Sequence, residues 1–274
     1  MGVCNVTPDS FSDGGRHFTP ASARARVDEL LAEGADIVDV GGESTRPGAA
    51  PVAPRDQLAR VLEVVRHAAS RGACVSIDTA SPEVAAATLD AGACAVNDVS
   101  CLRDSTLAAV VAASGSALVL MHSRGPQSRM PGFSQYPDDA YGDIVKDVCA
   151  EWEDAASRAR SLGVPRDAIL MDPGIGFAKN ARQSMDLLAR LAEVVRAVGV
   201  PVVVGASRKS FLTTVDASAP AGDRLGASIA AALHAAGAGA AVLRVHDVRA
   251  TRQALDLARR LADGSSRSGK ASPP

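Results

Sequence analysis

The chain is dominated by short, continuous apolar runs that alternate with segments of helical periodicity. Eight such runs, rich in Val, Ile, Leu and Ala, are each flanked by turn residues: MGVCNV, ADIVDVGG, CVSIDT, CAVNDV, ALVLMH, AILMDPG, PVVVGAS and AAVLRVH. Strands buried on both faces have this continuous pattern, which is typical of a parallel sheet covered by helices. Eight strand–helix repeats favour an α/β fold with a single (β/α)8 TIM barrel over an open doubly wound sheet, which commonly has about five or six strands.

Helix signals fill the segments between these runs. Ser81 and Pro82 are typical of a helix start, as a cap and a first-turn residue, and this helix is expected to end at Gly92. No long linker rich in proline, serine or charge interrupts the alternation. We therefore predict one barrel domain over residues 1–263, followed by a disordered polar tail over residues 264–274.

Composition excludes several kinds of partner and location. The chain is 47% hydrophobic with a formal net charge of -2, which argues against disorder and against a nucleic-acid partner, because neutralising phosphates needs a basic surplus. Five cysteines without a CxxC pair, and an N-terminus without a secretory signal, predict reduced thiols in a cytoplasmic protein. Residues 225–243 contain no Asp, Glu, Lys or Arg, but their Ala, Gly and His234 favour a buried helix, a turn and a strand over a membrane span.

Polar residues and long connections gather at one predicted face of the barrel. Three connections after strands are unusually long, and substrate loops occupy that position in barrel enzymes. They span Thr7–Thr19, Gly42–Pro54 and Ser123–Tyr141. Each predicted strand also ends in residues that can bind or ionise: Asn5, Asp39 with Glu43, Asp78, Asn97, His122, Asp172, Ser207 with Lys209, and Arg244 with His246.

Taken alone, these residues have simpler explanations. Asp78 can start a turn, Asp172 opens an Asp-Pro-Gly turn signal, and His122 can be a buried histidine with satisfied hydrogen bonds. Their joint placement on one face favours a binding site. The segments GIGFAK and GASRKS lack the full spacing of nucleotide-binding loops, and the sequence has neither zinc spacing nor a GxSxG elbow.

The residue types at this face indicate three kinds of ligand. Acceptors and an amide suit a flat heterocycle such as a pterin or a purine, the donors after the last two strands suit an anion, and hard oxygen ligands suit Mg2+ with a pyrophosphate. The three sets are Asp78, Asn97 and Asp172 for the heterocycle, Lys209, Arg244 and His246 for the anion, and Asn5, Asp9 and Asp13 for the metal. Together they predict displacement of pyrophosphate by a nucleophile.

Seven motifs occur in order along the chain. They are NVTPDSFSDGG at 5–15, GGESTRPGA at 41–49, SIDT at 76–79, NDVS at 97–100, DPGIGFAK at 172–179, SRKSF at 207–211 and RVHDV at 244–248. With these motifs the chain resembles the dihydropteroate synthases of folate biosynthesis, over about residues 1–260. The resemblance implies a Mg2+-dependent condensation of 6-hydroxymethyl-7,8-dihydropterin pyrophosphate with p-aminobenzoate, giving 7,8-dihydropteroate and pyrophosphate. It also implies a homodimer.

The same resemblance implies roles for individual residues. The pterin pocket is expected from Asp78, Asn97, Met121, Asp172 and Lys209, the pyrophosphate site from Asn5, Arg244 and His246, the Mg2+ site from Asn5 and Asp13, and the p-aminobenzoate wall from Phe11, Thr45, Arg46, Pro47, Phe177, Lys209 and Ser210. The catalytic set is Asp172, Lys209, Asn5, Arg244 and His246. Because an arylamine is a weak nucleophile, the expected mechanism is an SN1-like departure of pyrophosphate, with Asp172 stabilising the cation.

Some positions depart from the family pattern, and other functions compete. Ala178 stands where the family commonly has Gly, and the segment HSRGPQSRM matches only loosely. The alternatives are a pterin-dependent methyltransferase, a pterin-binding paralogue without turnover, and a synthase whose p-aminobenzoate loops are specialised for sulfonamide resistance. The pyrophosphate cluster weighs against the first two.

Overall fold

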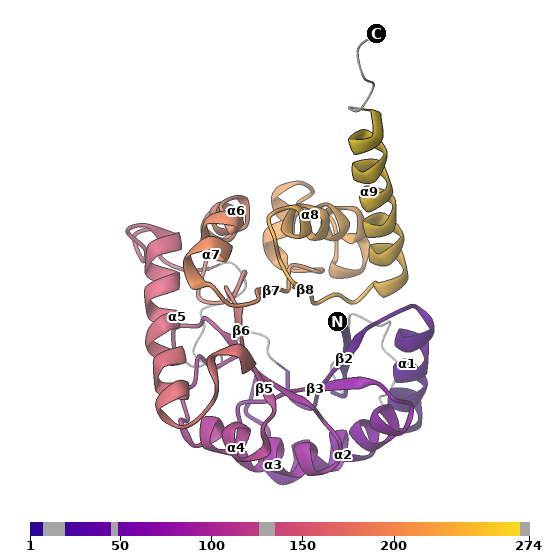
Figure 1. Cartoon of the computed structure of the whole chain (residues 1–274), viewed down its shortest axis with the longest axis vertical. Coiled ribbons are helices and arrows are strands. Elements are labelled where there is room, and N and C mark those ends of the chain that lie inside the picture. The colour runs from indigo at the N-terminus through magenta and orange to yellow at the C-terminus, as the bar shows by residue number, and fades with distance from the viewer. Residues whose placement is uncertain (8–19, 45–48, 126–134, 269–274) are drawn as a thin grey trace.

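Eight short strands form the centre of the molecule in a computed structural model, which describes residues 1–7, 20–44, 49–125 and 135–268 (Figure 1). The strands are β1 (Gly2–Asn5), β2 (Ile37–Gly41), β3 (Cys74–Asp78), β4 (Ala95–Asp98), β5 (Ala117–Met121), β6 (Ile169–Asp172), β7 (Val203–Val204) and β8 (Val242–Leu243). All paired neighbours are parallel, as the continuous apolar runs predict.

Helices surround these strands on the outside (Figure 1). The α-helices are α1 (Pro20–Ala32), α2 (Pro54–Ser70), α3 (Pro82–Asp90), α4 (Thr106–Ser114), α5 (Ile144–Ser161), α6 (Ala181–Ala189), α7 (Leu191–Val198), α8 (Leu225–Gly237) and α9 (Val248–Ser268). Short 3-10 helices are η3 (Arg166–Ala168), η4 (Ser210–Thr214) and η5 (Ala221–Asp223). Two helices, α6 and α7, fill the connection between β6 and β7.

Two isolated bridges close the ring of strands. Strands β1 to β6 form one sheet in sequence order, and β7 pairs with β8. Met171 bridges Val202 on one side of this pair, and Gly2 bridges Val245 on the other. At the second seam the Val3 amide donates to the Val245 carbonyl at 3.0 Å. The predicted single barrel is therefore confirmed, and its closure brings the C-terminal ends of all eight strands to one face.

Local signals in the sequence place the helices as predicted. The Ser81 hydroxyl accepts a hydrogen bond from the Val84 amide at 3.3 Å at the start of α3, and Gly92 after that helix has φ +109°. The apolar stretch at 225–243 forms α8 and then β8, and no described helix is long and apolar enough to span a membrane.

The last helix is longer than the sequence indicates. α9 runs to Ser268, so residues 264–268, which were predicted to begin a disordered tail, are helical. A helix that has already formed three or more turns adds further residues without a new nucleation cost, which explains the extension through glycine and serine. Residues 269–274 of the predicted tail lie outside the described residues.

Two cysteines meet at the end of the barrel opposite the C-terminal strand ends. Cys74 is the first residue of β3, and Cys94 immediately precedes β4. Their Sγ atoms lie 2.7 Å apart, and both residues are exposed. Partial shielding of the Cys74 sulfur from water and its hydrogen bond with the Cys94 thiol raise the pKa of Cys74 to about 12. The pair connects two adjacent strands through their side chains.

Candidate active site

The register of the parallel sheet places the predicted pterin residues side by side. Asp78 pairs with Asn97 across β3 and β4, and Met121 pairs with Asp172 across β5 and β6. All four lie at or next to the C-terminal end of a strand, and all are buried. Two adjacent ladder pairs therefore form a floor of one carboxylate, one amide, one thioether and a second carboxylate.

Arg244 connects this floor to the interior of the barrel. Its Nε donates to the Asp39 carboxylate at 2.7 Å, and its Nη2 donates to Asp78 at 2.8 Å. The Asn97 amide also donates to Asp39, at 3.3 Å. Burial opposes the charge of Arg244, but the two carboxylates outweigh it and raise the pKa of the guanidinium. Burial raises the pKa of Asp78 to about 7, against the opposing effect of Arg244.

Asp172 serves both as a turn residue and as a wall of the site. Its Oδ1 accepts a hydrogen bond from the Gly174 amide at 2.7 Å, which is the turn that the Asp-Pro-Gly sequence predicts. The side chain remains buried, and burial raises its pKa while the Lys209 cation opposes that shift. The turn interpretation and the site interpretation are thus compatible at this residue.

Lys209 brings the loop after β7 against the loop after β6. Its ammonium donates to the Ile175 carbonyl at 2.5 Å and lies 4.5 Å from the centroid of the Phe177 ring. Burial lowers the pKa of Lys209 to about 8, and Asp172 opposes that shift. The structure therefore places together two residues that were predicted for the p-aminobenzoate wall. Ser210, a third, follows directly at the start of η4.

His246 supplies a hydrogen-bond donor rather than a positive charge. Burial, with Arg244 and Arg208 adding to it, lowers the pKa of His246 to about 3, so the imidazole is neutral. The Ser207 hydroxyl accepts from the His246 amide at 3.3 Å and lies 3.1 Å from Nδ1. That hydroxyl can donate to Nδ1, which leaves the proton on Nε2. The cations of the anion set are therefore Lys209 and Arg244.

The predicted metal and loop residues are only partly described. Asn5 lies at the end of β1, and its Oδ1 would be 3.6 Å from a Cβ built on Gly41 of the next strand. Among the described residues, no group of three or more His, Cys, Asp or Glu side chains converges on one point. Six predicted site residues lie outside the described ranges: Asp9, Phe11, Asp13, Thr45, Arg46 and Pro47.

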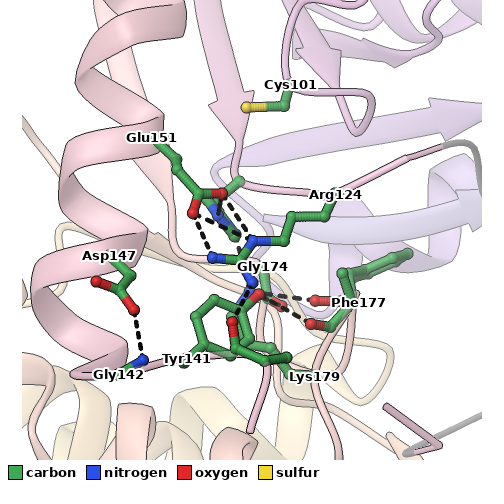
Figure 2. Close-up of polar contacts among 12 residues, drawn as sticks. Cys101, Arg124, Tyr141, Gly142, Asp147, Glu151, Gly174, Phe177 and Lys179 are labelled. Atoms are coloured by element: carbon green, nitrogen blue, oxygen red, sulfur yellow. Dashed lines mark hydrogen bonds and ion pairs between the residues drawn. The ribbon is translucent and has the colours of Figure 1, made fainter. Parts of the chain in front are cut away.

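A buried polar cluster behind the β6 turn was not predicted as a site (Figure 2). Lys179 Nζ lies 2.9 Å from His122 Nδ1, and His122 Nε2 lies 3.1 Å from the Glu151 carboxylate, which also pairs with Arg124. His122 is thus the satisfied buried histidine that the sequence allowed. The only sequence signal for Lys179 is its place at the end of DPGIGFAK, since nothing in the apolar pattern shows that a lysine is buried.

Comparison with known proteins gives consistent matches over the whole barrel. Residues 1–246 match the family model described as pterin binding enzyme. A dihydropteroate synthase of Mycobacterium leprae (strain TN) is 45% identical over 264 residues, which cover 94% of this chain and 91% of that protein.

Solved structures agree with that match. The chain is similar to a Yersinia pestis dihydropteroate synthase in a sulfonamide drug complex, with a TM-score of 0.89, 36% identity and coverage of 96% and 94% of the two chains. It is also similar to two structures of the Thermus thermophilus synthase. The complex with 4-aminobenzoate has a TM-score of 0.83 at 42% identity, and the complex with 6HMPPP has 0.80 at 40%, each with coverage of 95% and 93%.

Proposed function

The chain belongs to the pterin-binding enzyme family and, within it, to the dihydropteroate synthases, and we propose from this premise which of its residues carry out the reaction. The enzyme joins 6-hydroxymethyl-7,8-dihydropterin pyrophosphate to p-aminobenzoate and releases pyrophosphate. The observation that carries the residue assignment is the pairing of Asp78 with Asn97 and of Met121 with Asp172 on four consecutive strands.

The pterin ring is held against this floor. Carboxylates at Asp78 and Asp172 can accept hydrogen bonds from ring N–H and amino groups, the Asn97 amide can both donate and accept, and Met121 packs against the ring face. Arg244 keeps the Asp78 carboxylate in place through its 2.8 Å hydrogen bond. Lys209, electrostatically coupled to Asp172, completes the pocket from the side of β7.

The pyrophosphate leaves toward the ends of β8 and β1. Arg244 contributes positive charge, neutral His246 contributes an N–H donor, and Asn5 contributes an amide. The oxygen donors of Asn5 and Asp13 have the chemistry that Mg2+ prefers, so these two residues would hold the ion. When bound there, Mg2+ would neutralise charge on the departing pyrophosphate.

Bond breaking precedes bond making in the mechanism that we propose. The bond from the pterin methylene carbon to the bridging oxygen breaks, and its electron pair leaves with pyrophosphate. Asp172 stabilises the pterin cation that remains, because a buried carboxylate acts strongly on a nearby positive charge. The amino nitrogen of p-aminobenzoate then attacks the methylene carbon and loses a proton.

Oxygen-18 in the bridging position of the pterin pyrophosphate tests this order of events. If departure comes first, the label is expected to scramble into non-bridging positions of recovered substrate when p-aminobenzoate is absent. Nuclear magnetic resonance of the phosphorus atoms measures the exchange. Recovery of unscrambled substrate from a site in which the pyrophosphate can rotate would contradict the dissociative order.

The p-aminobenzoate molecule is expected to bind against Phe177 and Lys209, together with residues of the first two loops. Lys209 and Phe177 already contact each other, and Ser210 follows Lys209. Phe11, Thr45, Arg46 and Pro47 would complete the wall. A sulfonamide should compete for this position, in keeping with the sulfonamide complex of the Yersinia pestis relative.

The assembly that we propose is a cytoplasmic homodimer. Leu257 and Leu261 lie four residues apart on α9 and are 58% and 65% exposed, so they form an apolar strip on an outer helix. Helix α9 projects beyond the ring of helices (Figure 1). Exposed leucines at this spacing support a contact between two copies through α9.

One assay tests the function and separates it from the alternatives. The protein is incubated with the pterin pyrophosphate, Mg2+ and p-aminobenzoate, and dihydropteroate and pyrophosphate are measured. Equal amounts of both products, formed only when all three components are present, are expected. Pterin binding without either product would indicate the paralogue, and methyl transfer to a corrinoid protein would indicate the methyltransferase.

A further inference from the structure

The turn after β6 carries Phe177, and its backbone carbonyls converge on a buried lysine (Figure 2). Lys179 Nζ donates to the Gly174 carbonyl and to the Phe177 carbonyl, both at 3.1 Å. The side chain is only 2% exposed, which is rare for lysine and costly unless its hydrogens are paired. The ammonium therefore lies under the turn and not in the substrate pocket.

The third partner of Lys179 links the turn to helix α5. An ammonium has three hydrogens, and its third acceptor is His122 Nδ1 at 2.9 Å. Since Nδ1 accepts, the ring proton lies on Nε2, which donates to Glu151 at 3.1 Å. Arg124 holds the same Glu151 carboxylate through Nε at 2.9 Å. With this order of donors and acceptors, Lys179, His122 and Glu151 each have a hydrogen-bond partner for the atoms named.

Two further carbonyls of the turn, those of Ile175 and Ala178, are also held by side chains. The Ile175 carbonyl accepts from Lys209, and the Ala178 carbonyl accepts from the Tyr141 hydroxyl at 2.9 Å. Ala178 itself has φ +47°, a left-handed conformation that costs a residue with a Cβ some free energy. Such a conformation persists only where the surrounding contacts over-determine it.

We infer that Lys179 is a positioning residue for the second substrate, which it serves by fixing the turn that presents Phe177. It holds one carbonyl at each end of the 174–177 segment, while Lys209 holds a carbonyl between them and contacts the Phe177 ring. The assignment rests on the proposed function, because it takes Phe177 to be part of the p-aminobenzoate wall. Lys179 itself contacts neither substrate.

Substitution Lys179→Met separates positioning from a general structural role. It keeps an unbranched side chain only one atom shorter and removes all three donors, so the KM for p-aminobenzoate is expected to rise about tenfold or more. The KM for the pterin pyrophosphate should rise less than that for p-aminobenzoate, because Lys179 acts on Asp172 through its charge and donates its hydrogen bonds to the turn and to His122. A lower fraction of folded enzyme would reduce the apparent kcat but leave both KM values unchanged. The matched control is Lys146→Met, an exposed lysine on α5.

A second variant acts from the far end of the hydrogen-bond chain. Glu151→Gln keeps an oxygen for His122 but removes the charge, and a smaller rise in the same KM is expected, about two- to fivefold. If Lys179→Met does not fold, the KM for p-aminobenzoate of Glu151→Gln tests the positioning role in its place. Equal changes in the KM values for both substrates, or unchanged KM values for p-aminobenzoate, would overturn the positioning role.

Calorimetric binding of p-aminobenzoate makes the test independent of turnover. A wild-type protein that forms no dihydropteroate would contradict the proposed function. Weaker binding of p-aminobenzoate to Lys179→Met than to wild type would still support the positioning role. Equal affinity in the two proteins would refute it.

Discussion

Asp172 shows how one side chain can satisfy two demands. The Gly174 amide occupies one carboxylate oxygen, and burial raises the pKa of the group while Lys209 opposes that shift. In the proposed mechanism, the second oxygen is available to the pterin, and the negative charge of Asp172 stabilises the pterin cation.

Replacing Asp172 by asparagine removes that charge and keeps the shape of the side chain. A charged hydrogen bond is worth about 1.5–3 kcal/mol more than none, so kcat should fall by about one to two decades. Steady-state rates with saturating substrates measure the change, and circular dichroism checks folding. An unchanged kcat would remove Asp172 from the mechanism.

Lys209 is expected to set a limit to activity on the alkaline side. Burial lowers the pKa of Lys209 to about 8 in the unliganded protein, so its charge is present below about pH 8 and is lost above it. The kcat/KM for the pterin pyrophosphate, which reports on the free enzyme, should therefore decline as the pH rises through about 8. In Lys209→Arg, whose charge does not titrate in this range, the decline near pH 8 should disappear even if the rate is lower. An identical pH profile in the two proteins would show that the decline of kcat/KM near pH 8 comes from a group other than Lys209.

At the scale of elements, the turn after β6 packs directly against the backbone that follows β5. A Cβ on Gly174 would lie 2.0 Å from the His122 carbonyl oxygen, which belongs to the backbone and cannot rotate away. Gly115, at the end of α4, has the same φ of +67° but nothing within 4 Å of its Cβ position. An added Cβ would meet the same left-handed φ at both glycines, but it would have open space only at Gly115.

That difference makes Gly174→Ala and Gly115→Ala a matched pair. Gly115→Ala should reduce the free energy of unfolding by about 1–2 kcal/mol, through left-handed strain alone. Gly174→Ala should cost at least about 2 kcal/mol more, because the turn must also move away from β5. Urea denaturation followed by fluorescence of the single tryptophan, Trp152, measures both values. Equal losses would show that the turn can shift freely.

The sequence pattern was sufficient for the strands and for the residues at their ends. Asp78, Asn97 and Asp172 could be placed because polar residues at the end of a strand buried on both faces stand out from its apolar run. The burial of Lys179 and the pairing of Asp39 with Arg244 could not be predicted, because they depend on partners that are distant in the chain. The protonation state of His246 could not be predicted either, since the sequence does not show how far a side chain is removed from water.

On the scale of the whole molecule, ring closure and the site depend on the same residues. Arg244 follows β8 and binds carboxylates on β2 and β3, so it spans the seam where β8 meets β1. The N-terminal ammonium of Met1 donates to the Leu243 carbonyl at 3.0 Å and supports the same seam from the other end. We expect ligands at Arg244 and the stability of the barrel to be coupled for this reason.

The proposed dimer makes a prediction at this scale. Placing glutamates at both positions with Leu257→Glu and Leu261→Glu should convert the protein to monomers, because two charges would be buried in an apolar contact. Sedimentation velocity distinguishes the two states. Arg260→Glu, an exposed change on the same helix that alters the net charge by the same amount, should remain dimeric. Monomeric wild-type protein, or a dimer that survives both glutamates, would contradict an interface through α9.

The cysteine pair, at the end of the barrel opposite the C-terminal strand ends, is suited to site-specific labelling. Cys74 and Cys94 are exposed with sulfur atoms 2.7 Å apart, and they lie at the opposite ends of β3 and β4 from Asp78 and Asn97. A reagent that bridges two thiols with a short linker should therefore attach a dye or a surface tether at this single point. An enzyme immobilised in this way would present the C-terminal ends of its strands to the solution, which suits biosensors and the screening of inhibitors on a chip.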